Sequence, residues 1–169
     1  MPPVKAYIGI GSNLGDPLQQ VRDVIPMLAN MPGTRLAGVS SLYRSEPVSE
    51  LAQDDYINAV AAIETALEPA ALLLELQALE FAFYRQRDPG QKWGPRTMDL
   101  DILLYANRVM NDSYLVIPHP EMHRRLFVLL PLLEVAGDLY LAGLGSLSYL
   151  AGQAPSIRIE RLADEKTVA

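Results

Sequence analysis

The chain has 169 residues, of which 50% are hydrophobic and 20% charged, and its formal net charge is −6. This length suits a single domain, residues 1–169, in which the tail beyond about residue 143 is poorly defined by its sequence. The acidic balance disfavours a nucleic-acid binder, the absence of cysteine excludes disulfides and thiolate metal sites, and no apolar run reaches the ~20 residues of a membrane helix. Because the first residues also lack the long apolar stretch of a signal peptide, we expect a soluble, cytoplasmic protein without membrane or nucleic-acid partners.

The first half of the chain predicts a strand, a helix and two further strands. Apolar residues alternate over 4–10, which is typical of a strand. A helix follows, from the N-cap residue Asp16 to the helix-ending Pro32. Strands are then expected over 35–43 and 56–65, with a polar loop between them.

The second half begins with a helix near residue 68 that turns its leucines inward and shows Gln77 and Glu80 on the other side. Residues 85–97 contain one Pro–Gly and one Gly–Pro pair and predict a long loop, and 98–105 predict the last core strand. Weaker patterns predict short strands over 109–111 and 115–117, a helical stretch over 120–136 broken near Pro131, and a strand over 157–162.

The order of these elements is strand, helix, strand, strand, helix, strand, followed by extra helices. Such an order predicts an α+β fold with a ferredoxin-like βαββαβ core, in which both early helices cover one face of an antiparallel sheet. The late helices are expected on the other face, which gives three layers.

Two acidic residues, Asp99 and Asp101, form the strongest local feature. Residues two apart on a strand project to the same side, so the two carboxylates share one face with Leu103. The residues expected on the opposite face, in a core, are Met98, Leu100, Ile102 and Leu104. Two hard oxygen donors on a rigid strand suit Mg²⁺, and phosphate oxygens and waters would complete the coordination shell of the ion. The alternative is an exposed strand face that bears two acids.

Basic and aromatic residues stand directly before this pair. Four basic residues lie within twelve positions that hold a single acid, Asp88; they are Arg85, Arg87, Lys92 and Arg96. Trp93, in the same segment, adds an aromatic plane. Positive charge concentrated in an acidic protein indicates a polyanionic small ligand such as a nucleotide. His119, between two prolines, is a candidate phosphate donor or a histidine satisfied by backbone contacts; with two histidines and no thiolate, zinc is disfavoured.

A glycine-rich segment over residues 9–15 lies between the first strand and the first helix. Its third glycine comes one place late for the G-x-G-x-x-G dinucleotide motif, and the chain has no Walker-type phosphate loop. Arg44 could read a 2′-phosphate, so an NADP-dependent oxidoreductase stays an alternative.

Taken in order, these motifs resemble the 6-hydroxymethyl-7,8-dihydropterin pyrophosphokinase family from residue 7 to about residue 139. The most specific match is the string from Trp93 to Leu104, which contains both aspartates. The other matching pieces are residues 7–15, 41–47, Gln53 with 56–58, Glu80, Arg85, Arg87, 117–122, Arg125 and Phe127.

The resemblance implies transfer of pyrophosphate from MgATP to the hydroxymethyl group of the pterin, giving the pterin diphosphate and AMP in folate biosynthesis. It implies two Mg²⁺ ions on Asp99 and Asp101, with Arg85, Arg87 and Arg96 completing the catalytic set. ATP would contact Gln77, Glu80, Arg87, Trp93, Arg96, Ile102, His119 and Arg125. The pterin would contact Ser45, Pro47, Val48, Tyr56, Asn58, Trp93 and Phe127.

The chain departs from the family pattern at two glycines, which are replaced by Tyr84 and Ser49. Both changes bear on loop movement, and they keep open an inactive paralogue or a ferredoxin-like domain that binds a small molecule without turnover. A monomer is expected, with a dimer as the alternative.

Overall fold

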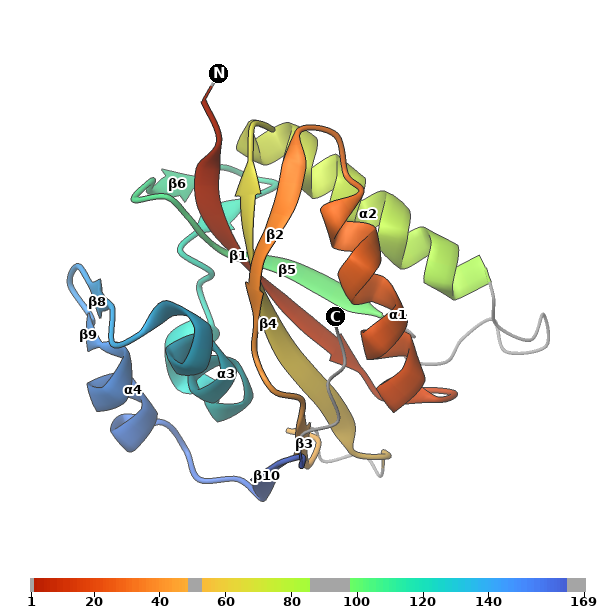
Figure 1. The fold of residues 1–169 in the computed structure, drawn as a ribbon. Helices are drawn as coiled ribbons and strands as arrows, with labels where there is room; N and C mark the ends of the chain where they lie inside the picture. Colours follow the sequence, from red (N-terminus) through yellow and green to blue (C-terminus); the bar gives the residue numbers. More distant parts are fainter. Residues whose placement is uncertain (1, 49–52, 86–97, 164–169) are drawn as a thin grey trace.

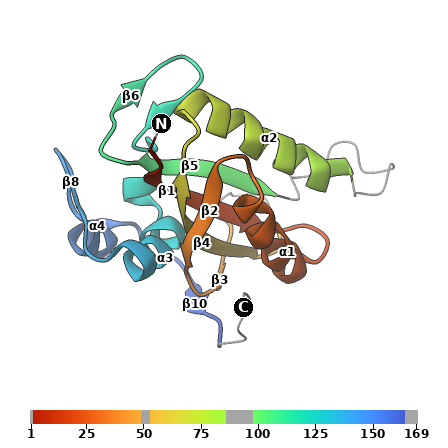
Figure 2. The same cartoon turned by 45° about the horizontal axis from the view of Figure 1, so that its top comes forward.

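The structure is a computed structural model that describes residues 2–48, 53–85 and 98–163. Helices cover both faces of one antiparallel sheet, so the domain has three layers (Figures 1 and 2). The helices are α1 Pro17–Ala29, α2 Pro69–Arg85, α3 Leu126–Ala136 and α4 Leu147–Gln153, with a 3₁₀ turn η1 at Met122–Arg124. The strands are β1 Val4–Ser12, β2 Thr34–Val39, β3 Tyr43–Ser45, β4 Tyr56–Thr65, β5 Asp99–Tyr105, β6 Met110–Asn111, β7 Val116–Ile117, β8 Tyr140–Leu141, β9 Gly145–Ser146 and β10 Ile159–Arg161.

The main sheet has the order β10-β3-β4-β1-β5, and β2 also pairs with β4. All the pairs within it are antiparallel, and β1 and β4 match along their whole length, from Val4 opposite Thr65 to Ser12 opposite Ile57. This arrangement confirms the predicted antiparallel ferredoxin-like core with helices on both faces.

The strand predicted over 35–43 is two strands, β2 and β3, that pair with different halves of β4. The break lies at Ser40, whose main-chain N–H donates to the Val60 carbonyl at 2.9 Å. The Val60 N–H in turn donates to the Ser40 hydroxyl at 2.9 Å, so a side chain replaces the carbonyl that a regular strand would supply.

Two apolar cores lie on opposite faces of the sheet. The first core lies under α1 and α2 and includes Ile8, Ile57 and Leu72. The second core lies under α3 and α4 and includes Tyr7 and Val60. Neighbouring residues of one strand thus contribute to different cores, as the alternation of a pleated strand requires.

Strand β5 contains an irregularity that changes the direction of one predicted core residue. The register with β1 shifts between Tyr7 and Ile8, so that Leu103 is an extra residue on β5. Leu103 and Leu104 consequently both lie in the second core, and the expectation that Leu104 points with Leu100 is wrong. The Leu103 carbonyl accepts the main-chain N–H of His119 at 3.0 Å, which ties the segment after β7 to the sheet.

The late part of the chain differs in two ways from the prediction. Pro131 lies inside α3 without ending it, and the helical stretch is instead interrupted at Arg125, whose φ and ψ of −115° and 100° are extended. A proline five residues after the helix start removes one backbone donor, and α3 tolerates this loss within its buried surroundings. Helix α4, capped by the Ser146 hydroxyl, was not predicted. None of the helices in the described residues has the length and apolarity needed to cross a membrane.

Candidate active site

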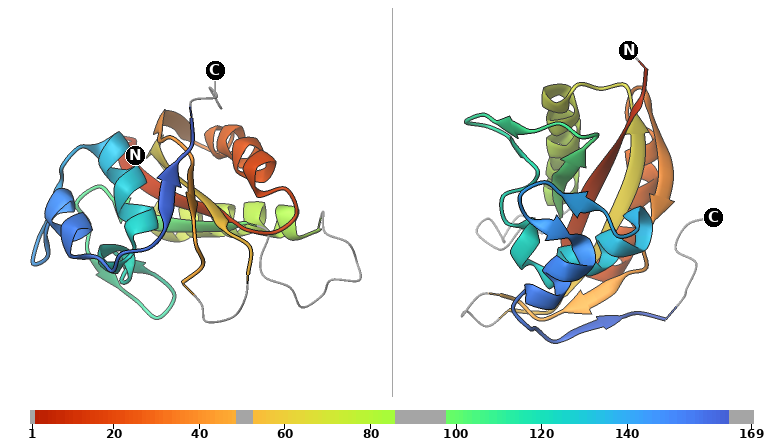
Figure 3. Two further views of the ribbon diagram at one scale, coloured as in Figure 1. Left: turned by 90° about the horizontal axis from the view of Figure 1, so that it is seen from below. Right: turned by 90° about the vertical axis from the view of Figure 1, so that its left-hand side faces the viewer.

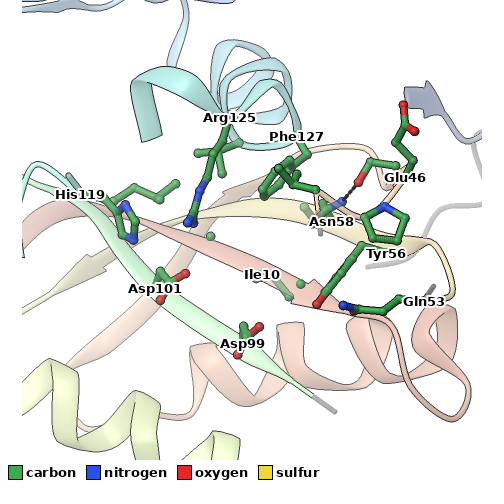
Figure 4. Close-up of a pocket in the computed structure, with 18 residues that line it drawn as sticks. Ile10, Glu46, Gln53, Tyr56, Asn58, Asp99, Asp101, His119, Arg125 and Phe127 are labelled. Carbon is green, nitrogen blue, oxygen red and sulfur yellow. Dashed lines mark hydrogen bonds between the residues drawn. The ribbon is translucent and has the colours of Figure 1, made fainter. Parts of the chain in front are cut away.

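A cavity of about 320 Å³ opens on the face of the sheet that carries α3, at the end that α3 and α4 leave uncovered (Figure 4). Four strands of the sheet, β1, β3, β4 and β5, contribute to its lining, and the chain around η1 and α3 forms one wall. Its lining includes Gly9, Gly11, Ser45, Glu46, Pro47, Val48, Gln53, Tyr56, Asn58, Asp99, Asp101, Leu103, His119, Arg125, Phe127 and Val128. The size is in the range of sites for small molecules.

The floor leaves room for a ligand because two residues of β1 have no side chain. Gly9 and Gly11 face the cavity, whereas their neighbours Ile8 and Ile10 face the first core. A Cβ on Gly9 would lie 3.2 Å from Leu103 Cδ2, and one on Gly11 would lie 3.3 Å from Asn58 Oδ1. These glycines lie in a strand that pairs antiparallel with both neighbours, unlike the parallel strand–helix turn of dinucleotide-binding folds.

One end of the cavity carries charged and ionisable groups. Asp99 and Asp101 project into it from β5 beside His119 and Arg125, as predicted from their spacing (Figure 4). Among the residues that the structure describes, no three histidine or acidic side chains converge to hold a metal. The two carboxylates fit Mg²⁺, an ion that commonly takes one or two carboxylates and completes its shell with phosphate oxygens and water.

His119 is held as a neutral donor at this end. Burial lowers the pKa of His119; Asp101 and Glu121 act in the opposite sense, and Arg125 lowers it further. The His119 Nδ1 atom accepts the main-chain N–H of Glu121 at 3.1 Å. Since Nδ1 is the acceptor, the proton of the neutral ring resides on Nε2, which is then a hydrogen-bond donor.

The other end of the cavity combines aromatic rings with an amide. Tyr56 from β4 and Phe127 from α3 project into the space from the sheet and from the helical layer, with Asn58 between them (Figure 4). The Asn58 Nδ2 atom donates to the Ser45 hydroxyl at 2.7 Å, which fixes the orientation of the amide. Arg125 lies over the Phe127 ring, with its guanidinium carbon 5.8 Å from the centroid, and so joins the two ends of the cavity.

Comparison with known proteins decides the family. Residues 7–137 match the sequence model of the family described as 7,8-dihydro-6-hydroxymethylpterin-pyrophosphokinase, HPPK. The chain belongs to this family. It is 46% identical over 138 residues to the 2-amino-4-hydroxy-6-hydroxymethyldihydropteridine pyrophosphokinase of Haemophilus influenzae, covering 82% of this chain and 85% of the relative. It is 42% identical over 158 residues to the protein of the same name from Pseudomonas aeruginosa, covering 94% of this chain and 96% of that one.

Solved structures with the same fold include a protein described as HPPK-DHPS in complex with substrates, at a TM-score of 0.70 and 11% identity. That match covers 90% of this chain but only 43% of the other, so this chain spans less than half of that protein. A Plasmodium falciparum HPPK-DHPS structure gives a TM-score of 0.71 at 12% identity, covering 89% of this chain and 45% of that one.

The cavity brings together ten of the residues that the HPPK resemblance implicates: Ser45, Pro47, Val48, Tyr56, Asn58, Asp99, Asp101, His119, Arg125 and Phe127. Three others lie elsewhere. Ile102 is 3% exposed in the first core, so a contact with a ligand would involve its main chain. Gln77 is exposed on α2, and Glu80 accepts the Leu100 N–H at 2.8 Å on the outer edge of β5. Arg85 is the last residue of α2; Arg87, Trp93 and Arg96 lie outside the described residues.

Sequence reasoning assigned no site role to several residues that line the cavity. Glu46, Gln53, Gly9 and Gly11 entered only as parts of family motifs, the two glycines also as parts of a dinucleotide-like string. The alternation of β1 contained the needed information, because residues 9 and 11 must face away from Ile8 and Ile10.

Proposed function

We propose that this member of the HPPK family transfers the pyrophosphoryl group of ATP to the hydroxymethyl oxygen of 6-hydroxymethyl-7,8-dihydropterin, in folate biosynthesis in the cytoplasm. The observation that carries the proposal is one cavity with two carboxylates at one end and two aromatic rings with a fixed amide at the other. The first end suits a metal-bound phosphate chain, and the second suits a flat, polar ring. A monomer is sufficient for this proposal, since one chain supplies both ends.

At the phosphate end, Asp99 and Asp101 would hold two Mg²⁺ ions, which when bound neutralise the phosphates and orient the attacked phosphorus. His119 would donate from Nε2 to a phosphate oxygen without adding charge, and Arg125 would add a fixed cation. Arg85, Arg87 and Arg96 would supply further positive charge around the phosphates. Glu80 would help to fix β5, since it binds the outer edge of that strand opposite the aspartates.

At the pterin end, Tyr56 and Phe127 would contact the two faces of the ring, and Asn58 would read its amide edge. The Ser45 hydroxyl accepts from Asn58 and thereby selects which atoms the amide presents to the ligand. Pro47 and Val48 would limit the length of the ring that fits, and Trp93 would close the site. On the nucleotide side, Gln77 and the main chain of Ile102 would frame the base.

The chemical step would be an attack of the pterin hydroxyl oxygen on the β-phosphorus of ATP. The bond from that phosphorus to the oxygen bridging the α-phosphate breaks, AMP leaves with the electron pair, and the hydroxyl proton passes to solvent. Positioning and charge neutralisation are sufficient for such a reaction. Asp99 and Asp101 would serve as metal ligands, and the third acid of the lining, Glu46, accepts the main-chain N–H of Arg158. We therefore expect no dedicated general base; a pH–rate profile dominated by one further titrating residue would contradict this.

The decisive experiment incubates the protein with ATP, Mg²⁺ and the hydroxymethyl-dihydropterin and separates the nucleotides. We expect AMP in equal amount to the pterin diphosphate. Formation of ADP would mean attack on the γ-phosphorus and would overturn the proposal. Binding of the pterin without any AMP, with or without Mg²⁺, would instead identify an inactive paralogue or a sensing domain.

A further inference from the structure

Strand β10 lies at the edge of the main sheet, next to β3 (Figure 3). Ser45 of β3 belongs to the lining at the pterin end of the cavity. Strand β10 pairs antiparallel with β3, from Ile159 opposite Ser45 to Arg161 opposite Tyr43. Beyond the ladder, the Leu162 N–H donates to the Leu42 carbonyl at 2.8 Å. The strand thus lies next to Ser45, the hydroxyl partner of Asn58 in the cavity.

Arg158, just before β10, contacts two separate segments of the cavity wall. Its guanidinium donates two parallel hydrogen bonds to Asp55, from Nη1 to Oδ2 and from Nη2 to Oδ1, each 2.9 Å long. Its main-chain carbonyl accepts the Glu46 N–H at 3.0 Å, and its N–H donates to the Glu46 carboxylate. Asp55 directly precedes Tyr56, and Glu46 directly precedes Pro47, so one residue links the two stretches that line this end.

We infer that Arg158 is a positioning residue for the pterin site, which sets the separation between the wall that holds Pro47 and the wall that holds Tyr56. This inference rests on the proposed function, because it assigns the site a pterin. Arg158 is absent from the cavity lining, so it acts through Asp55 and Glu46. The hydrogen bond from Arg158 lowers the pKa of Asp55, which agrees with a charged pair.

The energetics favour an effect on binding over an effect on folding. The Arg158 side chain is 64% exposed and that of Asp55 29% exposed, and pairs of this kind contribute little to the stability of the whole domain. A two-point contact nevertheless restricts the orientation of both partners, and a ring held between two walls is sensitive to their separation. Loss of the pair should therefore weaken pterin binding while the fold persists.

The test measures the pterin KM, the ATP KM, kcat and the pterin Kd for the wild type, Arg158→Ala, Asp55→Ala and the double variant. We expect the pterin KM and Kd to rise about fivefold in each variant, with the ATP KM and the melting temperature unchanged. The double variant should match the single ones, because both remove the same contact. Arg158→Lys, which keeps the charge without the parallel hydrogen bonds, should fall between Ala and the wild type.

A matched control is Arg108→Ala, which removes another exposed arginine. Arg108 forms an ion pair with Glu68 at 3.3 Å, and neither residue belongs to the cavity lining. The Arg108→Ala variant should leave the pterin KM unchanged. The inference is overturned if Arg158→Ala keeps the wild-type pterin KM and Kd, if it raises the ATP KM equally, or if the two single effects add. A wild type that neither binds the pterin nor forms AMP would overturn the proposed function itself, an outcome separate from these.

Discussion

The two faces of the sheet differ in how completely helices cover them. Under α1 and α2 the face is apolar and closed along its length, with Ile8, Ile63 and Ile102 fully or almost fully buried. Under α3 and α4 only one end is closed, over Tyr7 and Val60, and the other end is the cavity. Each central strand contributes to both faces.

The contrast is visible within β1, where the residues that face the first core are large along the whole strand, whereas those on the opposite face become smaller toward the cavity. Ile8 and Ile10 fill the first core, while the opposite face changes from Tyr7 under the helices to Gly9 and Gly11 in the cavity. The closed face holds the strands in place by apolar burial, which leaves the other face free to carry charge and open space. We therefore expect substitutions on the closed face to change stability and those on the open face to change activity.

The largest expected effect lies on the open face, at Asp101. Asp101→Asn should lower kcat by about 10³-fold, because an amide is a poor ligand for Mg²⁺ and the phosphates then lose a cation. The free energy of unfolding should stay the same or rise slightly, since Asp101 is exposed and a like charge beside Asp99 is removed. AMP formation and denaturant unfolding would be measured together. Asp112→Asn, at an exposed acid outside the cavity lining, is the control and should change neither.

The closed face should show the opposite pattern at Leu28 of α1, which is completely buried in the first core. Leu28→Ala should lower the free energy of unfolding by about 3 kcal/mol, through lost burial and a cavity. Its kinetic constants should stay within about twofold of the wild type while the protein is folded. Loss of kcat at a temperature where circular dichroism shows full folding would break the division between the faces.

The sequence was sufficient for the features that depend on local patterns. The sequence predicted a strand at Tyr56–Thr65, which is β4, and the period-two spacing of strand residues placed Asp99 and Asp101 on one face. It failed where a partner strand decides the geometry. The extra residue Leu103 depends on the register with β1, and the break at Ser40 depends on a hydroxyl that substitutes for a carbonyl opposite Val60.

The candidate site was predicted less completely than the fold, for the same physical reason. Family motifs named most residues that line the cavity, but they did not show that Gly9 and Gly11 are its floor. The neutral state of His119 follows from burial and from the Glu121 N–H, which exist only in the folded chain. The position of Arg158 likewise depends on β10 pairing with a strand more than a hundred residues earlier.

A smaller effect on the pterin KM should distinguish alanine substitutions at two glycines in strands of the same sheet. Gly11→Ala would place a methyl group 3.3 Å from Asn58 Oδ1 in the cavity floor, so we expect the pterin KM to rise about tenfold. Stability should change little, because the advantage of alanine over glycine within a strand is offset by the displacement of Asn58. Gly38→Ala in β2 is the matched control, since its Cβ would meet only Ala62 Cβ at an ordinary 4.0 Å. Equal pterin KM values in the two variants would contradict the assignment of the floor.

The smallest effect concerns Glu134 of α3, which joins the open-face layer to the sheet. One of its carboxylate oxygens accepts from the Ser41 N–H and hydroxyl, at 2.8 Å each, and the other from the Tyr43 hydroxyl at 2.8 Å. Burial raises the pKa of Glu134, but these hydrogen bonds and Arg161 outweigh it, so the net pKa lies below the usual 4.5. The charged form is therefore the one that the fold stabilises.

Because the pKa of Glu134 is lower in the folded chain, its contribution to stability is complete above pH 4.5 and declines as the pH falls through the folded value. Glu134→Gln should lower the free energy of unfolding by about 1 kcal/mol at pH 7, and the difference from the wild type should shrink toward pH 3. Glu160→Gln is the control, because the 3.4 Å contact between Glu160 and Arg44 is exposed and its loss should change stability little at either pH. Urea unfolding of the three proteins at both pH values measures this. A difference that grows as the pH falls would mean that the protonated carboxyl, not the carboxylate, is the form that stabilises the fold.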